Sequence, residues 1–226
     1  MLEPDGLLAS GGELSPEWLL SAYQQGIFPW FNTGEPILWW SPAQRFGFVP
    51  GQVHLSKSRI RQLRKTGWTV RADSCFDKII GRCAEIPRNQ QTGTWITDSM
   101  RQAYSRMHEL GYGHSIEVFD KNMLVGGLYG LAIGQMFFAE SMFSASSHAS
   151  ALALFALSQT LQSWRWPWLD AQMENPHLQL LGGQAMLRPR FLSLLAEQAS
   201  KTPVSGSWLS YFPGLSLHDY LEMNNH

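Results

Sequence analysis

The chain has 226 residues, of which 44% are hydrophobic and 15% are charged, and these values describe a globular protein with few charges. Seventeen basic and eighteen acidic side chains give a net charge of −1, so a nucleic-acid partner must be met by a local basic patch. Apolar runs of about 18 residues are absent, which excludes a transmembrane helix. The first residues lack the pattern of a signal peptide, and we expect a cytoplasmic protein.

Cysteine and histidine usage argues against a metal site or a disulfide framework. Cys75 and Cys83 are the only cysteines, and neither has metal-type neighbours. The seven histidines show no His-Glu-x-x-His spacing. We therefore expect reduced thiols and no bound metal.

The first 44 residues predict a small aromatic unit. Ser15-Pro16-Glu17 is typical of a helix start, because Ser caps a helix, Pro suits its first turn and Glu favours its dipole. Gly26 marks the end of this helix, and residues 28–42 are rich in aromatic and turn residues. We predict a small N-terminal domain over residues 1–44 and a larger domain over residues 45–226.

The rest of the chain alternates helical and strand-like patterns. We expect helices over residues 74–84, 98–110, 147–163 and 190–199, and strands over residues 115–119, 123–133, 136–143 and 168–173. Gly126, Gly127 and Gly130 indicate a bulge or a close backbone approach. This order predicts an α+β fold with a mostly antiparallel mixed sheet flanked by helices.

Three polar residues stand in otherwise apolar strand-like segments. Glu140 lies within residues 135–144, and Asp170 and Gln172 lie beyond the next helix. Ionisable groups are expensive to bury, and such places are where chemistry is usually found. Asp170 and Gln172 are two apart in an expected strand, as are Glu140, Met142 and Ser144, so each set is predicted to share one face.

Seven short sequence words occur in order along the chain. They are Phe28-Pro29-Trp30-Phe31, Trp39-Trp40-Ser41-Pro42, Gly93-Thr94-Trp95-Ile96-Thr97, His114-Ser115-Ile116-Glu117-Val118, Leu124-Val125-Gly126-Gly127-Leu128-Tyr129-Gly130, Glu140-Ser141-Met142-Phe143-Ser144 and Asp170-Ala171-Gln172. With these words the sequence resembles the bacterial leucyl/phenylalanyl-tRNA–protein transferases over roughly Pro4 to Phe191. It departs from the family at Ala139, which is usually Gly, and at Ala171, which is usually Cys.

The resemblance implies a fold, a reaction and partners. Family members have a small N-terminal domain and a C-terminal domain of N-acetyltransferase-like (GNAT-type) fold. They move Leu, Phe and, less readily, Met from aminoacyl-tRNA to the α-amino group of proteins that begin with Arg or Lys. The new N-terminal residue marks the acceptor for N-degron proteolysis. No cofactor is implied, and we expect a monomer.

The implied reaction is aminolysis of an ester, which needs a neutral amine, a proton acceptor and donors for the developing oxyanion. We assign catalytic roles to Asp170, Gln172 and Glu140. Asp170 polarises Gln172, whose carbonyl holds the attacking amine, and Glu140 recognises the cationic acceptor. Two plainer interpretations stand beside these: Asp170 caps a neighbouring loop or helix, and Glu140 forms a buried ion pair with an arginine.

The resemblance also implies a pocket for the transferred side chain. Its expected lining is Leu128, Phe137, Met142, Leu154 and Leu157, with Ser144 as a further substrate contact. On the sequence alone, each of the apolar residues is more often ordinary core. Such a pocket accepts Leu, Phe and Met but discriminates weakly, because one methylene is worth only ~1–3 kcal/mol.

Contacts with tRNA are expected at two places. Trp30 and Trp95 match family positions that stack on the terminal adenosine, at about 1–3 kcal/mol for each stack. The basic residues Lys57, Arg59, Arg61, Arg64 and Lys65 form the expected phosphate-contact surface. Arg59 is an addition of this chain to the family's basic positions. The alternative for the whole cluster is a solvated charged face.

Two other functions compete with the transferase. An acetyl-CoA-dependent N-acetyltransferase of the same architecture cradles pyrophosphate with a glycine-containing turn, but residues 143–149 contain no glycine. The second alternative is a tRNA-binding protein without catalysis. A measurement of catalytic turnover distinguishes the two, because a tRNA-binding protein without catalysis shows none.

Overall fold

The computed structural model describes residues 5–85, 96–204 and 206–223. Its N-terminal part is a three-stranded antiparallel sheet in the order β1–β3–β2, with one helix. The elements are β1 (Leu7–Ser10), α1 (Pro16–Gln24), β2 (Phe28–Pro29) and β3 (Leu38–Trp40). Ser15 caps α1 by accepting a hydrogen bond from the backbone N–H of Trp18, so the predicted helix start is confirmed. The domain division at residue 44 stays a prediction.

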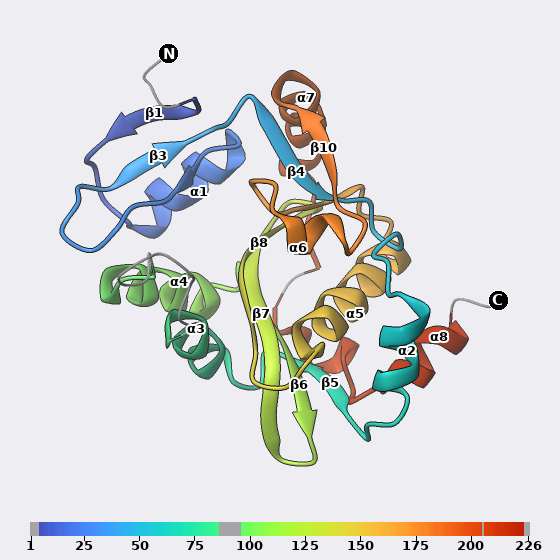
Figure 1. The fold of residues 1–226 in the computed structure, drawn as a ribbon. Helices are drawn as coiled ribbons and strands as arrows, with labels where there is room; N and C mark the ends of the chain where they lie inside the picture. Colours follow the sequence, from blue (N-terminus) through green and yellow to red (C-terminus); the bar gives the residue numbers. More distant parts are fainter. Residues whose placement is uncertain (1–4, 86–95, 205, 224–226) are drawn as a thin grey trace.

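The larger part of the chain is built on a seven-stranded sheet in the order β10–β4–β9–β8–β7–β6–β5 (Figure 1). Every neighbouring pair is antiparallel except β8 and β9, which are parallel. The strands are β4 (Gln44–Phe48), β5 (Thr69–Ala72), β6 (Gly113–Asp120), β7 (Met123–Ile133), β8 (Met136–Ser144), β9 (Trp168–Asp170) and β10 (Gln184–Leu187). The predicted α+β fold with a mostly antiparallel mixed sheet is confirmed.

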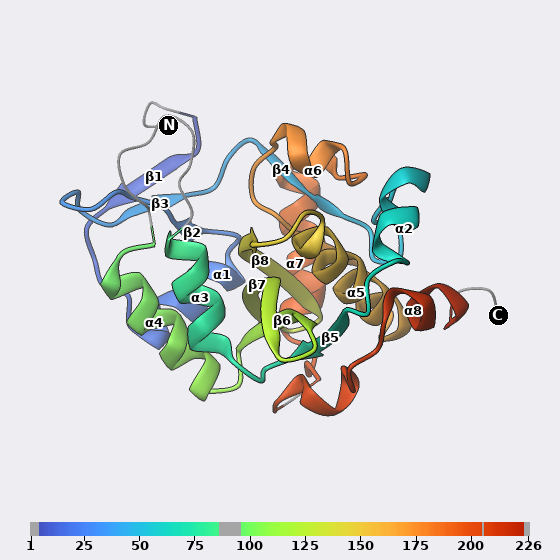
Figure 2. The same ribbon diagram turned by 60° about the horizontal axis from the view of Figure 1, so that its bottom comes forward.

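Helices cover both faces of this sheet (Figure 2). α5 (Ala149–Ser163) lies on one face with α2 (Lys57–Leu63) and α8 (Leu217–Met223). The other face carries α1, α3 (Phe76–Glu85), α4 (Asp98–Glu109) and α7 (Arg188–Ala199). The short helix α6 (Pro176–Gln179) follows β9, and a 3-10 helix spans Trp208–Tyr211. Neighbouring residues of β8 serve opposite cores, because Phe137 packs with α5 and Phe138 with α1 and α7.

Two glycines of β7 are required by close approaches. An added Cβ at Gly126 would stand 2.4 Å from the Cβ of Ala149, at the start of α5. Gly130 lies at a register shift, where β7 pairs with Ala139 and then with Ser141 of β8 and passes over the residue between them. This is a β-bulge at residue 140 of β8. A second register shift lies in β7 itself, where Gly126 pairs with Val118 and Leu124 with Phe119, so the bulge and the close approach predicted within this strand are confirmed.

The structure differs from the predicted elements in several respects, and the helices α2, α6 and α8 are among the elements not predicted. β1, β4, β5 and β10 are short strands that the pattern analysis does not predict. β9 ends at Asp170, whereas the pattern predicts a strand to residue 173. The strand ends early because Gln172 has a φ of 57°, in the left-handed region. No helix of the described ranges is long and apolar enough to cross a membrane.

Candidate active site

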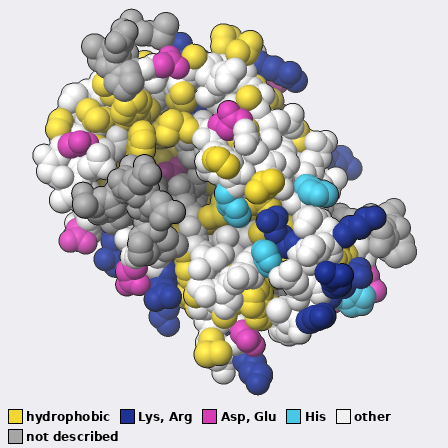
Figure 3. Space-filling view, viewed as in Figure 1, with side chains coloured by type: hydrophobic (Ala, Val, Ile, Leu, Met, Phe, Trp, Pro, Cys, Tyr) yellow, Lys and Arg dark blue, Asp and Glu magenta, His cyan; other side chains and the backbone are white. Residues whose placement is uncertain are grey.

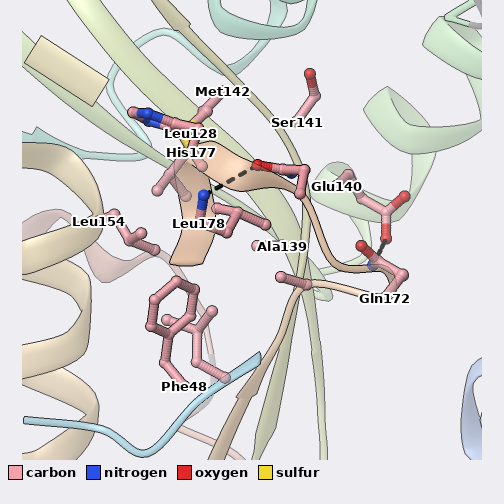
Figure 4. Close-up of a pocket in the computed structure, with 13 residues that line it drawn as sticks. Phe48, Leu128, Ala139, Glu140, Ser141, Met142, Leu154, Gln172, His177 and Leu178 are labelled. Carbon is pink, nitrogen blue, oxygen red and sulfur yellow. Dashed lines mark hydrogen bonds between the residues drawn. The ribbon is translucent and has the colours of Figure 1, made fainter. Parts of the chain in front are cut away.

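The β-bulge of β8 presents a partly buried carboxylate, Glu140, to the N-terminal part of the chain. Glu140 accepts hydrogen bonds from the Tyr23 hydroxyl, 2.6 Å from Oε1, and from the Tyr104 hydroxyl, 2.9 Å from Oε2. The side-chain amide of Gln172 donates to the same Oε1 at 3.2 Å (Figure 4). Because the bulge interrupts the alternation of β8, spacing by two no longer places Glu140 on one face with Met142.

The surroundings of Glu140 favour its protonated form. Burial is the largest cause and raises the pKa of Glu140 to about 7, although the hydrogen bonds from Tyr23 and Tyr104 act in the opposite direction. Burial also raises the pKa of both tyrosines well above their usual range, so they remain proton donors. The two hydroxyls lie 2.5 Å apart. Three contacts join these oxygens: Tyr23 to Tyr104, Tyr23 to Glu140 and Tyr104 to Glu140. The two hydroxyls supply only two protons, so all three contacts are hydrogen bonds only when Glu140 carries a third proton.

The second buried carboxylate, Asp170, is neutralised by an arginine. Arg45 donates from Nε to Oδ1 at 3.1 Å and from Nη2 to Oδ2 at 2.7 Å, and both side chains are fully buried. Its Nη1 donates to the Gly26 carbonyl at 2.9 Å, and the guanidinium lies 4.9 Å from the ring centroid of Phe28. One arginine therefore ties the end of β9 to the N-terminal part of the chain.

The predicted geometry of Asp170 and Gln172 is wrong in one respect. The two were expected to share a strand face, but Gln172 lies beyond β9 in a left-handed conformation. Arg45 engages both oxygens of Asp170, while Gln172 donates to Glu140. The buried ion pair that we considered for Glu140 is thus formed by Asp170. The ion pair of Arg45 with Asp170 holds the end of β9, and Gln172, two residues later, donates its hydrogen bond to Glu140.

An apolar pocket of about 580 Å³ lies beside Glu140 (Figure 4). Its apolar side chains are Phe48, Leu128, Ala139, Met142, Leu154, Leu169, Ala171 and Leu178. Three of the five residues predicted for such a pocket, Leu128, Met142 and Leu154, are among them. The polar lining residues are Glu140, Ser141, Gln172, Asn175 and His177.

Three predicted substrate contacts are not among the residues that line this pocket. Phe137 and Leu157 are fully buried in the core on the α5 face of the sheet. Ser144 accepts a hydrogen bond from the backbone N–H of Ser150 at 2.9 Å and so serves the start of α5. Pocket-lining and core side chains share one sequence pattern, and only the packing of the elements separates them.

A second hollow of about 250 Å³ adjoins the first. Both are lined by Glu140, Ala171, Gln172 and Asn175, so the titratable carboxylate stands where the two meet. Phe28 and Trp30 supply aromatic walls to the second hollow. The Trp30 ring meets Trp40 edge-on at 5.7 Å between centroids. Trp95, the other predicted stacking residue, lies outside the described residues.

The predicted tRNA-binding residues all belong to α2 or to the two positions after it. Lys57, Arg61, Arg64 and Lys65 are exposed, whereas Arg59 is half-buried. The space-filling view shows basic side chains gathered on this side of the molecule (Figure 3). The structure therefore brings the five residues together on one short helix and the two positions that follow it.

Sequence reasoning missed three residues of the site: Tyr23, Arg45 and Tyr104. The two tyrosines lie among apolar residues at helical spacing, and such a pattern is the same for a ring that only packs and for one whose hydroxyl binds a carboxylate. Arg45 lies in a strand that was not predicted. A carboxylate in an apolar strand does predict that hydrogen-bond donors surround it. The sequence does not indicate which residues these donors are.

Fold and site together define a class: α+β proteins with a two-part pocket and a titratable carboxylate at its junction. Residues 48–196 match the family described as leucyl/phenylalanyl-tRNA protein transferase, and residues 12–43 match the N-terminal domain of that family. The chain belongs to the leucyl/phenylalanyl-tRNA–protein transferase family. It is an aminoacyl-tRNA–protein transferase, an aminoacyltransferase.

Curated relatives match most of the chain. The leucyl/phenylalanyl-tRNA–protein transferase of Xanthomonas axonopodis pv. citri (strain 306) is 55% identical over 206 residues, which are 91% of this chain and 83% of that protein. The transferase of Xylella fastidiosa (strain M23) is 50% identical over 210 residues, which are 93% of this chain and 86% of that protein.

Similarity to solved structures is weaker. L-PGS from Bacillus licheniformis has a TM-score of 0.42 at 10% identity, covering 83% of this chain and 71% of that chain. A GCN5-related N-acetyltransferase from Kribbella flavida has a TM-score of 0.32 at 13% identity, covering 75% and 62%. Likeness at this level carries no weight for function.

Proposed function

We propose that the enzyme moves leucine, phenylalanine and, less readily, methionine from aminoacyl-tRNA to proteins that begin with Arg or Lys, and that it acts as a monomer. The added residue marks the acceptor for N-degron proteolysis. The observation that carries the proposal is the place of Glu140, at the junction of an apolar pocket and an aromatic hollow. One side suits the aminoacyl group and the other suits the terminal adenosine and the acceptor amine.

The apolar pocket supports the choice of donor. Its volume of about 580 Å³ exceeds what one amino-acid side chain needs, so Leu, Phe and Met all fit. An apolar pocket separates such side chains by only ~1–3 kcal/mol, which agrees with a graded preference. Trp30 offers a π-face to the adenosine, worth about 1–3 kcal/mol.

Charge supports the choice of acceptor. Glu140 and Glu174 both line the aromatic hollow, which therefore holds two carboxylates and two aromatic rings. An Arg or Lys side chain is attracted by the carboxylates and also by the faces of aromatic rings. An acceptor that begins with Ala gains neither interaction.

The chemistry follows from the contacts of Glu140. The amine nitrogen attacks the ester carbonyl, an N–C bond forms, and the bond from that carbon to the ribose oxygen breaks. Glu140, with a pKa of about 7, takes the proton from the amine and returns a proton to the ribose oxygen. Gln172 donates its N–H to Glu140, and its carbonyl is left to orient the amine.

Asp170 has a positioning role in this proposal. It is bound by Arg45 through two hydrogen bonds and does not contact the reacting atoms. The ion pair holds the end of β9, and Gln172 follows two residues later. Loss of Asp170 therefore acts on the reaction through the placement of Gln172.

Transfer of labelled leucine from charged tRNA to a short peptide tests the proposal. We expect transfer to a peptide that begins with Arg and none to the same peptide beginning with Ala. Glu140→Gln should abolish most of this transfer, whereas the exposed Arg106→Gln on α4 serves as the matched control and keeps it. Binding of tRNA without transfer to either peptide would favour the non-catalytic tRNA-binding protein. The transfer rates from tRNA charged with Phe, Met and the β-branched Ile then give the preference of the pocket for each side chain.

A further inference from the structure

We propose that Arg59, His148 and His177 form a subsite for the phosphodiester groups at the single-stranded 3′ end of the donor, and that they guide this end into the apolar pocket. The inference rests on the proposed function, since it places the donor in that pocket. It concerns residues outside the Glu140 junction and, in Arg59, a charge that this chain adds to the family's basic positions.

The three residues come from elements that the fold brings together at one opening. Arg59 belongs to α2, His148 is the N-cap residue of α5, and His177 lies in α6 and lines the apolar pocket. His148 Nε2 lies 3.0 Å from Oε1 of Gln62, which joins the start of α5 to α2. Both ribbon views show α2, α5 and α6 as neighbours (Figures 1 and 2).

The placement of α6 beside α2 is fixed by backbone contacts. The N–H of His54 donates to the Leu181 carbonyl at 2.7 Å, so the segment before α2 is bonded to the segment after α6. Gly182 packs against the same stretch, because an added Cβ would stand 3.1 Å from the carbonyl oxygen of Gln52. These contacts hold the segment after α6, the helix that carries His177, against the segment before α2, the helix that carries Arg59.

The cluster is basic and has no counter-charge. In the part of the chain that the structure describes, no ion pair includes Arg59, His148 or His177, and the buried Nε of Arg59 has no hydrogen-bond partner. Partial burial, followed by the charges of Arg59 and His148, lowers the pKa of His177. The charge of Arg59 thus disfavours a proton on His177, and an anion bound between the two side chains would offset this effect.

The position of the cluster identifies the anion as a phosphodiester of the donor. The aminoacyl group is esterified to the last ribose, so the next phosphates must leave the pocket toward the rest of the tRNA. The cluster lies between the pocket, through His177, and the exposed basic residues of α2, through Arg59. On the face in Figure 3, histidine and basic side chains lie between the middle of the molecule and the side on which the basic side chains gather. The positive end of the α5 dipole lies beside His148 and favours the same anion.

Donors of increasing length test the inference. Leucyl-adenosine has no phosphate, the leucylated trinucleotide cytidylyl-cytidylyl-adenosine has internal phosphodiesters, and leucyl-tRNA has all contacts. We expect Arg59→Gln and His177→Gln to lower kcat/KM for the trinucleotide about tenfold and for leucyl-adenosine less than twofold. Arg106→Gln, on the opposite face of the sheet, should leave all three donors unchanged.

The same variants are measured by binding of the uncharged trinucleotide, which needs no turnover. Arg59→Gln should weaken this binding about tenfold and reduce the slope of log K against log salt by about 0.7, the value for one phosphate of a single strand. An unchanged affinity and slope would overturn the inference, and so would equal losses with leucyl-adenosine and the trinucleotide. If the variants weaken trinucleotide binding while the wild type transfers nothing, the subsite stands and the proposed function fails.

Discussion

Two carboxylates lie within one site, Asp170 fully buried and Glu140 partly buried, and their surroundings differ. Asp170 meets a guanidinium that offers two hydrogen bonds and a full opposite charge. Glu140 meets two hydroxyls and an amide, which offer hydrogen bonds without charge. Burial penalises a charged carboxylate in both places, but of the two only Asp170 forms a direct ion pair; at Glu140 the charge of Arg45 is the smallest of the causes that act on its pKa.

The comparison shows how one residue type is given two tasks. A carboxylate that an arginine binds through two hydrogen bonds serves to hold structure. A carboxylate among neutral donors keeps a pKa of about 7, so it gains and loses a proton near neutral pH. Each of the following changes breaks or sharpens this difference.

The largest effect is expected from Arg45→Met. This change leaves Asp170 buried without its cation, which typically costs about 3–5 kcal/mol. We expect the free energy of unfolding, measured by urea denaturation, to fall by that amount. Adding Asp170→Leu to the same chain should recover most of the loss, because the uncompensated charge is then gone. A double variant as unstable as Arg45→Met would show that the contacts of Arg45 with Gly26 and Phe28 matter more than the ion pair.

Glu140→Gln should have the opposite profile. The amide has no titrating group, so we expect transfer of leucine to the Arg peptide to fall about a hundredfold. Single-turnover transfer measures this loss, and the trinucleotide affinity should be unchanged. Wild-type transfer rates in the variant would contradict the role of Glu140 and leave it a structural acceptor of the tyrosine hydroxyls.

The pH dependence separates the two carboxylates further. The folded-state pKa of Glu140 is raised to about 7 from its ordinary value of 4.5, so the stability of its protonated form is fully present below the lower value and is lost as pH rises through about 7. Wild type should therefore lose stability relative to Glu140→Gln between these values. The ratio of wild-type to variant transfer rates should rise up to tenfold per pH unit and level above about 7. A flat ratio would contradict the proton-accepting role.

How much of this could be predicted differs between the fold and the site. The long elements α4, α5, β7 and β8 follow from periodicity because each repeats one pattern over many residues. The short strands β4 and β10 were missed, since strands of five and four residues carry too little alternation. They matter nevertheless, because β4 carries the arginine that binds Asp170.

In the site, sequence words identified Glu140, Asp170 and Gln172 but not the contacts among them. The alternation rule paired Asp170 with Gln172, and the left-handed backbone of Gln172 redirects that side chain to Glu140. A non-glycine residue rarely adopts this conformation, so no pattern predicts it. The partners of Glu140 lie 117 and 36 residues away along the chain, and only the packing of α1 and α4 against the sheet brings them together.

The smallest expected effect tests the neutral donors of Glu140. The Tyr104 hydroxyl stabilises the charged carboxylate, so Tyr104→Phe should raise the pKa of Glu140. A hydrogen bond to a charged group is worth about 1.5–3 kcal/mol, and one pKa unit corresponds to about 1.36 kcal/mol, so the shift should be about one to two units. To measure this shift, the transfer rate of Tyr104→Phe is divided by that of the double variant Tyr104→Phe, Glu140→Gln at each pH. The pH at the midpoint of this ratio gives the pKa of Glu140 in the Tyr104→Phe background. Tyr211→Phe, at an exposed tyrosine, is the control and should leave the midpoint in place. An unshifted midpoint in Tyr104→Phe would mean that the remaining hydroxyl of Tyr23 and the amide of Gln172 are sufficient to set the pKa of Glu140.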